Sequence, residues 1–160
     1  MVASAAKICD AEQIICSGLS QIPCTSRLFE EIMHVVEMYK NNETKNKVFE
    51  YIHSKYNEGG SYGWCHTISN AMIVAASLLF EEGDFGKPVC MAVETGFDTV
   101  CNGATVGSII GMANGIESVN KKWSAPFNDI LETTIFGVGN VKISECAEKT
   151  VKHIEKAYKF

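Results

Sequence analysis

The sequence lacks the features that mark several classes of protein. Its lysines and arginines form no cluster, and 14 basic residues are outnumbered by 19 acidic ones, which gives a formal net charge of −5 at pH 7. Because phosphate backbones are bound by clustered basic side chains, we expect no nucleic acid among its partners. None of its seven cysteines forms a Cys-x-x-Cys pair, so the spacing of zinc-binding and thioredoxin-like sites is missing as well.

Long apolar runs are missing too. The longest uncharged helical stretch, residues 99–116, holds four glycines and several polar side chains, which make it too polar for a membrane span. Lys7, Asp10 and Glu12 interrupt the N-terminal residues early, so we expect no signal peptide. An odd number of cysteines in a chain too large to need disulfides indicates reduced, half-buried thiols. These features predict a cytoplasmic protein without a membrane partner.

What the sequence does contain is helical periodicity along most of its 160 residues. Asp10 with Gln13, and then Thr25 or Ser26, are signals that begin helices. With 46 % hydrophobic and 21 % charged residues, the composition is that of a globular domain. We therefore predict an all-α fold and a single domain over residues 1–160. The further helices are expected at residues 43–55, 66–82, 87–94, 98–114, 129–134 and 144–158, with loops or irregular segments at 57–63, 120–127 and 136–142.

The expected helix at residues 98–114 carries a glycine at every fourth position. Gly103, Gly107, Gly111 and Gly115 lie close to one helical face. Each glycine costs a helix about 0.8–1 kcal/mol relative to alanine, so the stripe indicates that a neighbouring backbone packs close to it. Asp98 is expected to cap this helix, and exposed N–H groups at a helix start favour anions. Spacing alone leaves two interpretations open, a tight helix crossing in the core or a functional site at the helix start.

Three blocks of sequence carry a resemblance to a known family. They are residues 64–71 (Trp-Cys-His-Thr-Ile-Ser-Asn-Ala), residues 82–85 (Glu-Gly-Asp-Phe) with 92–109 (Ala-Val-Glu-Thr-Gly-Phe-Asp-Thr-Val-Cys-Asn-Gly-Ala-Thr-Val-Gly-Ser-Ile), and residues 123–129 (Trp-Ser-Ala-Pro-Phe-Asn-Asp). With these blocks the chain resembles the ADP-ribosylglycohydrolase family, which includes the dinitrogenase-reductase-activating glycohydrolases. The middle block is the most specific, because it joins a turn, an acid and a glycine-rich helix in that order.

The resemblance implies a compact all-α enzyme that holds two magnesium ions. Such an enzyme cleaves the glycosidic bond that joins ADP-ribose to a modified side chain or to another ADP-ribose. In the family, an early Thr/Ser-Asp-Asp cluster and a later Asp-x-Asp-Thr/Ser motif hold the metals, in keeping with the preference of Mg²⁺ for hard oxygen ligands. The chain contains no such early cluster, so we expect it to correspond to the later part of the family domain.

The later motif also departs from the family pattern. Asp98 matches its first acid and Thr99 its spacer, but Val100 stands where the second acid belongs. Cys101 occupies the hydroxyl position, and a soft thiol is a poor ligand for magnesium. Asp98 and Cys101 are thus the predicted remnants of the metal site. With one carboxylate left, we expect neither tight Mg²⁺ binding nor strong activity from this chain.

Five residues are predicted to contact the ADP-ribosyl group. His66 and Asn70 share a helix face four residues apart, Trp64 offers a ring for stacking, and Thr99 and Asn102 lie within a turn of Asp98. The alternative for His66 is that it begins a helix as a buried, hydrogen-bonded side chain without a ligand.

Three hypotheses for the function follow. The chain removes ADP-ribose, or it is a non-catalytic copy that retains weak ADP-ribose binding or assists a complete enzyme, or it is a helical interaction module whose glycine face packs against a partner. A partial domain leaves apolar helix faces uncovered, so we also predict self-association or dependence on a missing N-terminal segment.

Overall fold

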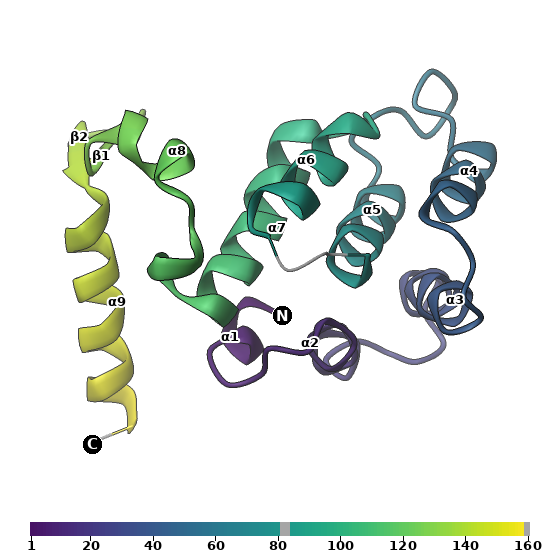
Figure 1. Ribbon diagram of the computed structural model, residues 1–160, viewed down its shortest axis with the longest axis horizontal. Coiled ribbons are helices and arrows are strands. Elements are labelled where there is room, and N and C mark those ends of the chain that lie inside the picture. Colours follow the sequence, from purple (N-terminus) through teal and green to yellow (C-terminus); the bar gives the residue numbers. More distant parts are fainter. Residues whose placement is uncertain (81–83, 159–160) are drawn as a thin grey trace. The chain divides into compact units, whose positions relative to one another are not determined.

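The computed structural model describes residues 1–80 and 84–158 of the chain (Figure 1). These residues form two compact units, Met1–Val119 and Asn120–Phe160. The prediction of an all-α fold is confirmed, because helices make up most of the structure and the sheet has two short strands. The single-domain assignment stays a prediction.

The first unit contains α1 (Val2–Ala5), α2 (Ala11–Leu19), α3 (Arg27–Lys40), α4 (Lys45–Lys55), α5 (Thr67–Leu79), α6 (Gly86–Glu94), α7 (Thr99–Asn114) and the 3₁₀ turn η1 (Ile116–Ser118).

The helix starts follow the capping signals in the sequence. Asp10 accepts a hydrogen bond from the Gln13 N–H, and Ser26 accepts one from the Phe29 N–H, so α2 and α3 begin where predicted. Thr44 caps α4 in the same way. Such a cap stabilises a helix by about 1 kcal/mol relative to alanine. Local sequence therefore fixes where these helices begin.

Helix α5 is the centre of the first unit. Ten of its 13 residues are buried, as its predicted apolar surface on most sides requires. It packs against α3 and α4 on one side and against α6 and α7 on the other (Figure 1). The helix was predicted to reach residue 82, but it ends at Leu79, and residues 81–83 lie outside the described part of the chain. Among the described residues, no helix is long and apolar enough to cross a membrane.

The glycine stripe of α7 faces α6, which is its most extensive partner. A Cβ built on Gly103 would lie 3.0 Å from a methyl of Val93, and one on Gly107 would lie 3.5 Å from the Phe85 ring. The predicted helix crossing is therefore present, but the atoms nearest to the glycines belong to side chains and not to a neighbouring backbone. Gly115 does not belong to the packed face, since it ends α7 with φ +76° and has open space around it.

A half-buried polar cluster joins α3 to α4. The Glu31 carboxylate lies 2.5 Å from the Lys55 ammonium and accepts a hydrogen bond of 3.0 Å from the Tyr51 hydroxyl. Burial raises the pKa of Glu31, but the hydrogen bonds from Lys55 and Tyr51 outweigh burial, so the pKa is lowered overall. A buried charge is tolerated here because both oxygens have donors.

The second unit contains one β-hairpin and one long helix. Its elements are α8 (Lys121–Ser124), η2 (Ala125–Phe127), β1 (Ile130–Glu132), β2 (Asn140–Lys142) and α9 (Ile143–Tyr158). The strands pair antiparallel, with Leu131 opposite Val141. Asp129 accepts hydrogen bonds from the N–H and the hydroxyl of Ser144, at 2.8 and 2.6 Å, and these lower the pKa of Asp129. It thereby holds the first turn of α9.

Three predictions about local structure were wrong. The helix expected at residues 129–134 is the strand β1, and the irregular segment at 136–142 contains β2, because the strands pair with each other around turns at Gly137 and Gly139, both with positive φ. The loop expected at 120–127 is the short helix α8 followed by η2.

The prediction of half-buried cysteines is wrong for six of the seven. All seven are free, but six are exposed and Cys90 alone is half-buried. Three of the exposed cysteines, Cys9, Cys24 and Cys65, lie between helices, and Cys16 lies outside the buried face of α2.

Candidate functional site

The turn before α7 places Asp98 at the helix start. Gly96 and Phe97 both have positive φ, +86° and +58°, and the Phe97 side chain is buried. Glu58 accepts a hydrogen bond of 2.9 Å from the Phe97 N–H. The Asp98 carboxylate then accepts one of 3.3 Å from the Cys101 N–H, which confirms the predicted cap. A non-glycine residue in the left-handed region is strained, so the surrounding contacts hold this turn in place.

Asn70, on the first turns of α5, connects the starts of the two helices. Its side-chain amide nitrogen donates hydrogen bonds of 2.9 Å to the backbone carbonyls of Trp64 and His66. Its side-chain oxygen accepts a bond of 3.0 Å from the Asp98 N–H and one of 2.7 Å from the side-chain amide of Asn102. Asn102 is 2 % exposed, so this bond satisfies a buried amide.

A pocket of about 320 Å³ opens beside these residues, between α5 and α7. We call it the Asp98 pocket. It brings together four of the seven predicted site residues, from two segments of sequence about 30 positions apart. Its lining consists of Met1, Cys65, Thr67, Asn70, Ala71, Val74, Asp98, Cys101, Asn102 and Thr105.

The other three predicted residues lie outside that lining. Trp64 has an exposed ring, and its backbone carbonyl is the group that contacts Asn70. His66 is the residue that precedes α5, with its ring 5.1 Å from the Tyr56 ring and 4.8 Å from the Tyr62 ring. The His66 Nδ1 is buried without a hydrogen-bond partner. Thr99 is the first residue of α7.

The donor set of the Asp98 pocket does not fit a pair of magnesium ions. Among the described residues of its lining, Asp98 is the one carboxylate, and Val100 is 78 % exposed with no ligand atom to offer. Within residues 1–80 and 84–158, no group of three or more His, Cys, Asp and Glu side chains could hold a metal ion. A hydrogen bond to Asp98 raises the pKa of the Cys101 thiol, which keeps that soft ligand protonated.

Thr105 and Glu58 are two of the contributors that were not predicted from the sequence. Thr105 lines the pocket seven residues after Asp98, and helical spacing from Asp98 through Cys101 could have found it. Glu58 holds the turn from a loop 39 residues earlier, and no local pattern signals such a contact.

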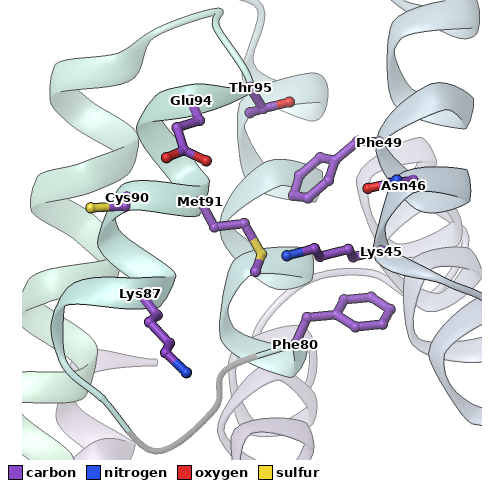
Figure 2. Close-up of a pocket in the computed structure, with 9 residues that line it drawn as sticks. All are labelled: Lys45, Asn46, Phe49, Phe80, Lys87, Cys90, Met91, Glu94 and Thr95. Atoms are coloured by element: carbon purple, nitrogen blue, oxygen red, sulfur yellow. The ribbon is translucent and has the colours of Figure 1, made fainter.

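A second pocket, of about 430 Å³, lies between α4 and α6 at the end of α5 (Figure 2). The side chains of Lys45 and Met91 extend toward each other in it, with the Phe49 and Phe80 rings on either side of Lys45. Although it is larger, it contains none of the predicted site residues. Its lining consists of Lys45, Asn46, Phe49, Phe80, Lys87, Cys90, Met91, Glu94 and Thr95.

Comparison with known proteins gives one match. A family model described as ADP-ribosylglycohydrolase matches residues 1–157. No curated protein and no solved structure matches the chain. The match covers the three sequence blocks and the whole Asp98 pocket.

Proposed function

Because the chain belongs to the ADP-ribosylglycohydrolase family, we propose that the Asp98 pocket binds the ADP-ribosyl group of a modified side chain or small molecule. The observation that supports this most is the convergence of Asn70, Asp98, Cys101 and Asn102 on one pocket. Its volume of about 320 Å³ falls within the usual range for ligand sites. Carboxylate and amide oxygens there are suited to accept hydrogen bonds from ribose hydroxyls.

We further propose that cleavage of the glycosidic bond by this chain is weak or absent. Members of the family generally depend on metal, and the proposed metal remnants here are Asp98 and Cys101 alone. Two-metal hydrolysis requires carboxylates that bridge and orient the ions. Val100 removes one formal charge and one ligand from the motif. If cleavage is absent, the chain is a non-catalytic copy that binds ADP-ribose. The alternative to binding is a helical interaction module.

The first experiment is a thermal melt of the purified chain alone, with Mg²⁺, with ADP-ribose and with both. A ligand that binds only the folded state stabilises it by about 2.7 kcal/mol at one hundred times its dissociation constant. We expect ADP-ribose to raise the midpoint and Mg²⁺ alone to leave it unchanged. A cooperative melt that ADP-ribose does not shift would contradict the binding proposal and favour the interaction module.

Val100→Asp is the matched variant for this experiment. It restores a carboxylate two residues after Asp98 on an exposed position, so the fold has no reason to change. A Mg²⁺-dependent shift in this variant, absent from the parent chain, would show that the site is short of one ligand. If Mg²⁺ does not change the melting midpoint of Val100→Asp, the pocket lacks further metal ligands besides the one at position 100. Sedimentation of the parent chain tests the predicted self-association separately.

A further inference from the structure

The side-chain amide of Asn70 has no capacity left for a ligand. A primary amide offers two N–H donors and one oxygen with two lone pairs. Both donors bind backbone carbonyls before α5, and both lone pairs receive donors from α7, the Asp98 N–H and the Asn102 amide. Because all four hydrogen-bonding positions of this amide are occupied, its oxygen must face α7 and its nitrogen must face the carbonyls before α5.

The fixed orientation of Asn70 dictates the orientation of Asn102. Because the Asn70 oxygen faces α7, the Asn102 side chain must turn its nitrogen toward Asn70, at 2.7 Å. Its own carbonyl oxygen is then the end that remains for the Asp98 pocket, which Asn102 lines. Together with the Asp98 carboxylate, this oxygen gives the pocket two acceptors beside the start of α7. Two such acceptors favour ligand groups that donate, as the hydroxyls of a ribose do.

We propose that Asn70 is a positioning residue for the ADP-ribosyl group and does not bind it directly. It holds the Asp98 backbone through the Asp98 N–H, and it fixes the orientation of the Asn102 side-chain amide. The Asn102 oxygen and the Asp98 carboxylate are then the acceptors that the pocket offers to the ribose. This inference rests on the proposed function and assigns a role within the same site.

The test compares Asn70→Ala with the isosteric Asn70→Asp. Alanine removes every bond, whereas aspartate keeps the two acceptors toward α7 and loses the two donors toward the carbonyls before α5. Asn46→Ala, an exposed asparagine on α4, is the matched control. The measurements are ADP-ribose affinity by calorimetry and hydrogen exchange of the Asp98 backbone amide by NMR.

We expect Asn70→Ala to bind ADP-ribose about tenfold or more weakly, the equivalent of one lost hydrogen bond in a buried setting. Its Asp98 amide should exchange rapidly, while Asn70→Asp keeps that amide protected and Asn46→Ala matches the parent chain in both measurements. Parent-like affinity in Asn70→Ala would overturn the proposal, even if the Asp98 amide exchanges faster, because Asn70 would then support the fold alone.

Asn102→Asp tests the same inference without touching α5, which matters if Asn70→Ala does not fold. It replaces the nitrogen that faces Asn70 with an oxygen, so two acceptors meet and the amide orientation is lost. We expect weaker ADP-ribose binding with the Asp98 amide still protected, and parent-like affinity would overturn the proposal. If the parent chain itself binds no ADP-ribose, the proposed function fails, and the exchange data alone show whether Asn70 holds Asp98.

Discussion

Two faces of α7 are held by different kinds of contact. The polar face, with Asp98 and Asn102, is joined to α5 through the directional hydrogen bonds of Asn70. The glycine face, with Gly103, Gly107 and Gly111, lies against α6, where the closeness of the two helices depends on missing side chains. One helix thus uses one face for the candidate ligand site and another for packing. Substitutions on the polar face should change ligand binding and local chemistry, and substitutions on the glycine face should change stability.

The largest expected effect comes from filling the closest contact on the glycine face. Gly103→Leu places a Cβ 3.0 Å from the Val93 methyl and three further carbons beyond it. Overpacking of this kind typically costs about 1–3 kcal/mol. We expect a matching fall in the free energy of unfolding, measured by urea denaturation. Ser108→Ala, an exposed position on the same helix, is the control and should stay within about 0.5 kcal/mol. An equally small effect of Gly103→Leu would refute the steric account of the glycine stripe.

A smaller effect of opposite sign is expected at the far end of the stripe. A Cβ on Gly111 would lie 3.9 Å from the Phe85 ring, which is ordinary contact. Gly111→Ala therefore gains helix propensity without a clash, by up to about 1 kcal/mol. The urea midpoint should rise relative to the parent chain. A lower midpoint would mean that the glycine face tolerates no methyl group anywhere, contrary to the distances from each Cβ, which increase from Gly103 to Gly111.

The smallest effect belongs to the polar face and concerns the reactivity of Cys101. Since a hydrogen bond to Asp98 raises the pKa of Cys101, this exposed thiol carries less thiolate at pH 8 than an ordinary cysteine. Asp98→Asn keeps a good capping side chain but removes the charge, so the pKa falls and alkylation of Cys101 should become several-fold faster. Mass spectrometry measures this rate against exposed Cys24 in the same molecule. An unchanged ratio of the two rates would show that Asp98 does not control the thiol.

Much of the fold could be predicted from local sequence, because its signals act over a few residues. Asp10, Ser26 and Asp98 cap helices through contacts three positions away. The glycine stripe identified a close helix crossing through its period. The hairpin of β1 and β2 escaped prediction because its strands are three residues long, too short to establish an alternating pattern.

Residues of the candidate site could be predicted from the sequence, but the hydrogen bonds that join them could not. Helical spacing placed Asn102 near Asp98, and the family resemblance added Asn70. The bonds that join Asn70 to Asp98 and to Asn102 span 28 and 32 positions, and the one from Phe97 to Glu58 spans 39. Contacts of that separation depend on how whole helices pack, which no local pattern in a single sequence reports.

The Glu58 contact has a genetic consequence. A Cβ on Gly96 would lie 2.9 Å from a carboxylate oxygen of Glu58, and the φ of +86° adds a strain of about 1–2 kcal/mol for any other residue. Gly96→Ala should displace the Glu58 carboxylate and weaken its hydrogen bond to the Phe97 N–H. The change should therefore cost more beside Glu58 than beside an alanine at position 58, where that bond is already lost and the strain alone remains. Two positions 38 residues apart thus form an epistatic pair, in which the double variant is harmed less than the sum of the two single changes because both disturb the same hydrogen bond.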